Sequence, residues 1–164
     1  MKSCKAVIAT AIPIERESVC SHLSEIKGDS CDGTRYWRGT FLSGESTWDV
    51  LVVETGKGNT AAARETGRAL SYFKPTIALF CGIAGGIKDV RIGDVVAAND
   101  VLYYEFQKVV SESDAEMKIQ ARPCGFPSNY NLTQLAKFES SRDDWEPAWI
   151  RPQTNLGQKS SMKP

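Results

Sequence analysis

The chain has 164 residues, of which 41% are hydrophobic and 24% charged, and its 20 Lys and Arg residues balance 20 Asp and Glu residues. This length suits one domain with a sizeable core, and the balanced charge argues against a general attraction to nucleic acid or to an anionic membrane. No apolar run approaches the ~20 residues that span a bilayer, and the N-terminus lacks the pattern of a signal peptide. We therefore expect a cytoplasmic protein with a small-molecule partner, without nucleic-acid or membrane binding.

The cysteines and the histidine form no pattern of a metal site. The five cysteines are odd in number and form no CxxC pair, so neither a disulfide framework nor a zinc site is indicated. The single histidine, His22, falls in a predicted helix, where a surface or packing role is commoner than a catalytic one. The sequence therefore predicts no metal and no cofactor.

The first half of the chain reads as alternating strands and helices. Residues 5–11 are an apolar run that predicts a buried strand, and residues 14–26 carry apolar side chains at helical spacing. Residues 34–44 and 46–55 are rich in β-branched and aromatic residues, which predicts a β-hairpin. Residues 55–73 begin with a glycine turn and continue as an alanine-rich helix that ends near a proline.

The second half begins with the apolar run of residues 76–82, which predicts a central strand covered on both faces. Residues 94–105 predict a strand pair or one long bent strand, residues 110–127 a polar loop, and residues 130–142 a helix. Strands that alternate with helices in this order indicate an α/β protein with a mixed sheet. The proline-rich residues 143–164 predict an extended or poorly ordered tail.

Two glycine clusters follow two of the apolar strands, at residues 56–58 and 82–86. Ligands of α/β sheets tend to bind at strand ends, where glycine lets the backbone approach them closely. Tight turns without a ligand would look the same in sequence. Residues 56–60, GKGNT, lack the Lys-Ser/Thr ending of a P-loop, and residues 82–87, GIAGGI, are not a dinucleotide-binding G-x-G-x-x-G motif.

Glu15 is the candidate catalytic side chain, because it falls in the first turn of the helix after the first strand. That turn can face the same crevice as the glycine turns, where a carboxylate could activate water. The alternative is a solvent-exposed carboxylate that only complements the helix dipole. Glu17 is a weaker candidate, because two helical positions turn it to another face.

Three motifs together resemble the nucleoside phosphorylase and nucleosidase superfamily, particularly its methylthioadenosine/adenosylhomocysteine nucleosidase branch. They are VIATAIPIERESV, TGKGNTAAA and GIAGGIKDVRIGDVV, which follow the family's order over most of the first ~110 residues. The resemblance implies a three-layer α/β/α fold around a central mixed sheet. It also implies hydrolysis of the N-glycosidic bond of a purine nucleoside.

Residue by residue, the resemblance implies that Glu15 activates the attacking water. The residues implied to line the substrate pocket are Ile12, Gly82, Ile83, Ala84, Gly85 and Gly86. Tyr103 and Tyr104 match a segment that reaches the neighbouring subunit's pocket in the family's dimers, so a homodimer or higher homo-oligomer is implied. We expect a family domain over residues 1–142, incomplete at its C-terminus, and the tail over residues 143–164.

The sequence departs from the family at three points. Ile83 replaces a serine, and Phe80 replaces the arginine that phosphorylases use before this turn, so water is the expected nucleophile. The family's aspartate that protonates the leaving base belongs to a part that this chain does not match. Two alternatives stay open: a catalytically silent nucleoside-binding or sensor domain of a larger protein, and a phosphate-dependent nucleoside phosphorylase.

Overall fold

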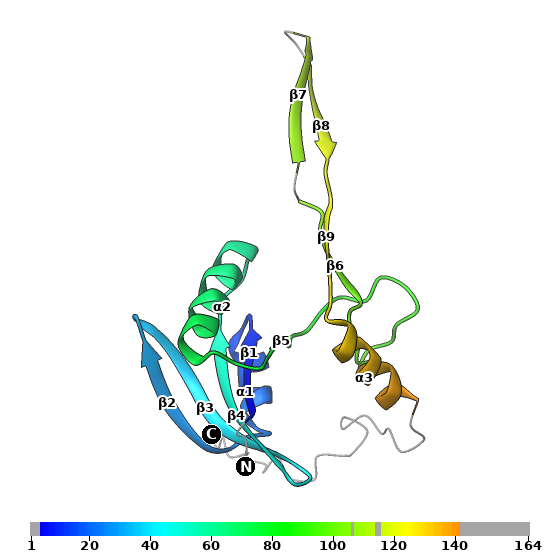
Figure 1. Cartoon of the computed structure of the whole chain (residues 1–164). Helices are drawn as coiled ribbons and strands as arrows, with labels where there is room; N and C mark the ends of the chain where they lie inside the picture. Colours follow the sequence, from blue (N-terminus) through cyan, green and yellow to red (C-terminus); the bar gives the residue numbers. More distant parts are fainter. Residues whose placement is uncertain (1–3, 106, 114–115, 142–164) are drawn as a thin grey trace, which may run out of the picture. The chain divides into compact units, whose positions relative to one another are not determined.

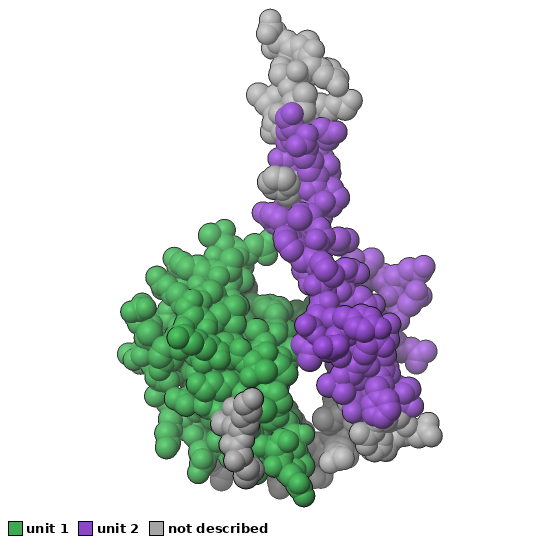
Figure 2. Space-filling model, viewed as in Figure 1, with its two compact units in different colours: residues 1–85 green, residues 86–164 purple. Residues whose placement is uncertain are grey.

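The structure is a computed structural model that describes residues 4–105, 107–113 and 116–141. The chain divides into two compact units, residues 1–85 and residues 86–164 (Figure 2). Each unit is a separate set of packed elements and is described by itself. The predicted tail, residues 143–164, lies outside the described residues.

A mixed five-stranded sheet with two helices forms the first unit (Figure 1). The sheet order is β2-β3-β4-β1-β5, with β1 parallel to both β4 and β5, and β3 antiparallel to both β2 and β4. In chain order the elements are β1 (Cys4–Thr10), α1 (Pro13–Cys20), β2 (Ser24–Cys31), β3 (Thr34–Ser43), β4 (Ser46–Glu54), α2 (Asn59–Phe73) and β5 (Ile77–Phe80).

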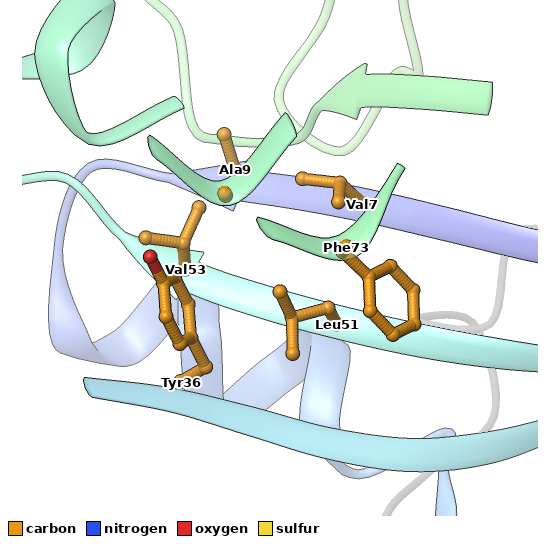
Figure 3. Packing of buried hydrophobic residues seen from close by; sticks show 7 residues of the cluster. Val7, Ala9, Tyr36, Leu51, Val53 and Phe73 are labelled. Atoms are coloured by element: carbon orange, nitrogen blue, oxygen red, sulfur yellow. The ribbon is translucent and has the colours of Figure 1, made fainter. Parts of the chain in front are cut away.

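The two helices cover opposite faces of this sheet. Successive side chains of a strand point to opposite faces, so neighbouring residues of β4 pack against different helices. On one face, Val7 and Leu51 pack with Phe73 of α2 in a fully buried cluster (Figure 3). On the other face, Val50 and Val52 pack with residues of α1. The continuous apolar runs of β1 and β4 thus fill two cores, and the predicted three-layer α/β/α arrangement around a mixed sheet is confirmed.

Two short antiparallel ladders and one helix form the second unit. Strand β6 (Asp100–Tyr103) pairs with β9 (Cys124–Pro127), and β7 (Gln107–Ser113) pairs with β8 (Glu116–Ala121). Helix α3 (Tyr130–Ser140) begins at Asn129, whose side chain accepts hydrogen bonds from two backbone N–H groups of the first turn. This cap explains the start of the predicted helix 130–142.

Four sequence predictions about elements were wrong. The helix expected over residues 14–26 ends at Cys20, because the chain turns and residues 24–31 pair with β3 as a strand. The expected loop over residues 110–127 contains the end of β7 and the whole of β8 and β9, which antiparallel backbone pairing defines without an apolar pattern. Residues 94–105 contain only the four-residue strand β6.

The fourth wrong prediction concerns β5, which was expected at the centre of a sheet. It is the edge strand of the described five-stranded sheet, and Leu79 and Phe80 are 45% and 67% exposed. Across the described part of the chain, no helix is long and apolar enough to cross a membrane.

Candidate active site

Three parallel strands of the first unit end at the same edge of the sheet. Thr10 at the end of β1 is in register with Glu54 at the end of β4, and Ala9 is in register with Phe80 at the end of β5. The chain leaves β1 through the turn before α1, β4 through the first glycine turn (residues 56–58), and β5 through the second glycine turn (residues 82–86). The topology therefore brings Glu15, residues 56–58 and residues 82–85 of the first unit to the carboxyl ends of these strands, where α/β sheets bind ligands.

Glu15 lies in the first turn of α1, and its side chain is directed back toward the ends of β1 and β5. Its Oε2 accepts hydrogen bonds from the backbone N–H groups of Ala11, at 2.7 Å, and Ile12, at 3.1 Å. Its Oε1 accepts one from the N–H of Ile83, at 2.8 Å. With only 8% of its surface exposed, Glu15 is not the solvent-exposed dipole partner that the sequence left open.

Those three N–H groups hold Glu15 in its ionised form. The hydrogen bond from Ile83 lowers the pKa of the Glu15 carboxyl, burial opposes it, and the bonds from Ala11 and Ile12 add to the lowering. A carboxylate has about four acceptor positions. Backbone N–H groups fill three of them, and among the described residues no further donor reaches Oε1, which can therefore accept one more hydrogen bond.

The second glycine turn is shaped around this carboxylate. A Cβ atom on Gly82 would lie 2.8 Å from Oε1 of Glu15 and 3.1 Å from its carboxyl carbon. At that distance a Cβ atom would force the Glu15 carboxyl to shift, so glycine at position 82 allows the close approach of Glu15 to this backbone segment. The Gly82–Ile83 peptide and Glu15 form one structural unit, although 68 residues separate Ile83 from Glu15 in the chain.

The other predicted pocket residues differ in their surroundings. Ile12 supplies the N–H described above, and its carbonyl accepts the first backbone bonds of α1. Ile83 exposes 75% of its surface, and a Cβ on Gly85 would meet nothing within 4 Å. Gly86 belongs to the second unit, where a Cβ would collide with the side chain of Val90.

Tyr103 and Tyr104 also belong to the second unit. Tyr103 ends β6, and Tyr104 is 73% exposed. Their implied role in a neighbouring subunit's pocket stays a prediction, as does the role of Ala84 in lining the substrate pocket. Glu17, the weaker catalytic candidate, points to solvent with 69% of its side chain exposed.

Two threonines of this edge were missed by the sequence reasoning. The N–H and the hydroxyl of Thr55 both donate to the carbonyl of Thr10, at 2.8 and 3.1 Å, and the Thr10 hydroxyl donates to the carbonyl of Val53 at 3.4 Å. Both threonines are buried. The sequence signal for them was a threonine at the end of each of two apolar strands. Their hydrogen bonds join the turn before α1 to the first glycine turn.

Comparisons with known proteins assign the family. The sequence model of the Phosphorylase superfamily matches residues 5–153, so the chain belongs to the phosphorylase superfamily. The chain is 27% identical over 139 residues to a 5′-methylthioadenosine/S-adenosylhomocysteine nucleosidase of Glaesserella parasuis, in a match that covers 84% of this chain and 58% of that protein. It is 33% identical over 89 residues to the nucleosidase of the same description from Actinobacillus succinogenes, covering 54% of this chain and 38% of that protein.

A solved structure gives the same family relationship. The 5′-methylthioadenosine/S-adenosylhomocysteine nucleosidase of Colwellia psychrerythraea, in complex with adenine, superposes with a TM-score of 0.66 at 25% identity. That superposition covers 84% of this chain and 55% of the other. The chain therefore spans little more than half the length of this solved relative.

Proposed function

We propose that the chain binds a purine nucleoside and hydrolyses its N-glycosidic bond, with Glu15 as the catalytic carboxylate. The observation that carries this proposal is the buried, ionised Glu15 held against the Gly82–Ile83 peptide by the 2.8 Å bond to Ile83. The Glu15 carboxylate and the two backbone segments that donate to it, Ala11–Ile12 and Gly82–Ile83, thus lie at the carboxyl ends of the same strands. The nucleosidases described above, one of them in complex with adenine, support a purine nucleoside as the substrate class.

The chemistry follows from the charge that develops during cleavage. When the C1′–N bond breaks, the purine takes the bonding electrons and a proton from solvent, and the ribose becomes an oxocarbenium-like cation. An ionised carboxylate stabilises that positive charge and orients a water molecule through the free acceptor position on Oε1. The water oxygen then bonds to C1′ and its proton passes to Glu15. The lowered pKa makes Glu15 a weak base, so charge stabilisation and water orientation are its larger contributions.

Water is proposed as the nucleophile instead of phosphate. Phosphate binding needs cationic or N–H donors, and the position before the second glycine turn is occupied by the apolar side chain of Phe80. The experiment is base release from adenosine and 5′-methylthioadenosine in phosphate-free buffer and again with added phosphate. Release with the free sugar as co-product, ribose or 5-methylthioribose, is expected in both buffers. Release that requires phosphate and yields the corresponding sugar 1-phosphate would identify a phosphorylase instead.

We also propose that the chain acts as a homo-oligomer in the cytoplasm, with residues 1–142 as its family domain. The exposed Tyr104 and the apolar side chains of β6 and β9 support a self-association surface in the second unit. Light scattering of the purified chain tests this. A mass of two or more chains is expected, and a monomer at micromolar concentration would contradict it.

A further inference from the structure

We infer that Arg16 is a positioning residue for Glu15, acting through its contacts with β3 and β4. This inference rests on the proposed function only for its kinetic consequence. Arg16 follows Glu15 directly in α1 and keeps only 18% of its side chain exposed.

The Arg16 guanidinium contacts three side chains. It lies 4.3 Å from the centre of the Trp37 ring of β3, and its Nη1 lies 3.4 Å from a carboxylate oxygen of Glu54 at the end of β4. Its Nη2 donates to Glu17 at 2.7 Å. A guanidinium held between two carboxylates and a ring is not available to bind a phosphate, so we assign it a structural task at this edge.

We assign to Arg16 the role of keeping Glu15 within hydrogen-bond distance of the Ile83 N–H group. Ile83 follows β5, and Glu15 is carried by α1, which packs on the sheet over β4. The 2.8 Å bond between them forms only if the first turn of α1 is fixed relative to the strand ends. Arg16 links that turn to β3 and β4, and its own backbone N–H donates to Ile12 at the start of α1.

Arg38 provides a matched control within the same sheet. It also makes an ion pair, with Asp49 at 2.6 Å, and lies over an aromatic ring, that of Phe73 at 5.3 Å. These contacts involve the middle of β3, Asp49 of β4 and the end of α2, away from the first turn of α1 that carries Glu15. Replacing Arg38 by alanine therefore removes the same kinds of interaction without loosening the first turn of α1.

The test compares Arg16→Ala and Arg38→Ala in the full chain. The first readout is the Glu15 pKa, measured by NMR titration of ¹³C-labelled glutamate carboxyls, which does not depend on activity. We expect the Glu15 pKa to rise in Arg16→Ala, because the Ile83 bond that lowers it is weakened, and to stay unchanged in Arg38→Ala. The second readout is base release, for which we expect kcat to fall roughly 10- to 100-fold in Arg16→Ala with little change in KM.

Two results of this comparison would contradict the role of Arg16. An unchanged Glu15 pKa in a folded Arg16→Ala protein, or an equal rise in Arg38→Ala, would overturn the inference. If Arg16→Ala does not fold, Glu54→Gln removes the ion pair to β4 and leaves the Trp37 contact to β3, and a smaller rise in the Glu15 pKa is required of it. Should the wild-type chain release no base, the proposed function fails, while the NMR titration still decides the role of Arg16.

Discussion

Glu15 and its three N–H partners make a carboxylate site that depends on main-chain atoms. Ala11, Ile12 and Ile83 all donate through the backbone, so their side chains have no part in these bonds. The sequence could indicate Glu15 because its position in the first helical turn is readable from the pattern. The sequence could not indicate which N–H groups bind the Glu15 carboxylate, because every residue except proline has a backbone N–H group.

Glu15→Gln should lower turnover about 100-fold or more while nucleoside binding is largely retained. The amide has no negative charge to stabilise the oxocarbenium-like centre. Its NH₂ group takes the place of one carboxylate oxygen and cannot accept the hydrogen bond that this oxygen receives from Ile83 or from Ala11. Single-turnover base release and equilibrium titration with an adenosine analogue measure the two effects. Glu45→Gln, in the exposed turn between β3 and β4, is the control, and equal rates for wild type and Glu15→Gln would remove Glu15 from the mechanism.

Gly82→Ala should impair the site far more than Gly85→Ala. The new methyl group at position 82 has to displace the Glu15 carboxyl, whereas the one at position 85 enters open space. We expect a loss of base release of roughly tenfold or more at position 82 and little change at position 85. Similar activity in both variants would show that the carboxylate does not need its close approach to the turn.

At the scale of elements, a buried polar contact joins β3 to α2. The Thr34 hydroxyl donates to Oε2 of Glu65 at 2.7 Å, and Arg64 donates to Oε1 at 2.9 Å. This hydrogen bond from Thr34 is the main cause of the lowered pKa of Glu65, and the arginines add to it. Both Thr34 and Glu65 are buried, so the contact fixes the helix on the strand with a directional bond as well as with apolar packing.

Thr34→Val removes this hydroxyl without changing the size of the side chain. We expect a loss of about 1–3 kcal/mol in the free energy of unfolding, because a buried carboxylate is left with one hydrogen bond fewer. Chemical denaturation measures it. Thr47→Val, at an exposed position of β4, should change stability by less than about 0.5 kcal/mol, and equal effects at both positions would contradict the role of the contact.

Elements with apolar runs were predictable, and elements made by pairing were not. The sequence predicted β1, the β3–β4 hairpin and α2, because each has a strong apolar or helical pattern. Strand β2 has a polar sequence and becomes a strand through its pairing with β3, which no local pattern encodes. The edge position of β5 could not be read either, because an apolar run specifies burial and not the neighbour that provides it.

At the scale of the whole molecule, acid should destabilise the chain through Glu15 and Glu65. Both carboxyls have lowered pKa values in the folded state, so their stabilisation is complete above the unfolded-state pKa of about 4.3 and is lost as pH falls through the folded values. Urea unfolding between pH 7 and pH 3 should show a steeper loss in wild type than in the double variant Glu15→Gln, Glu65→Gln. Equal pH slopes would contradict this.

The proposal for the whole molecule is that this part of a phosphorylase-superfamily fold carries a site for purine nucleoside hydrolysis around Glu15. The most direct measurement is adenine release from 5′-methylthioadenosine with the full chain in molar excess, in phosphate-free buffer, compared with Glu15→Gln. We predict stoichiometric adenine release by the wild type and a strongly reduced rate in the variant. Tight nucleoside binding by the wild type without any adenine release would contradict the account and identify a binding module.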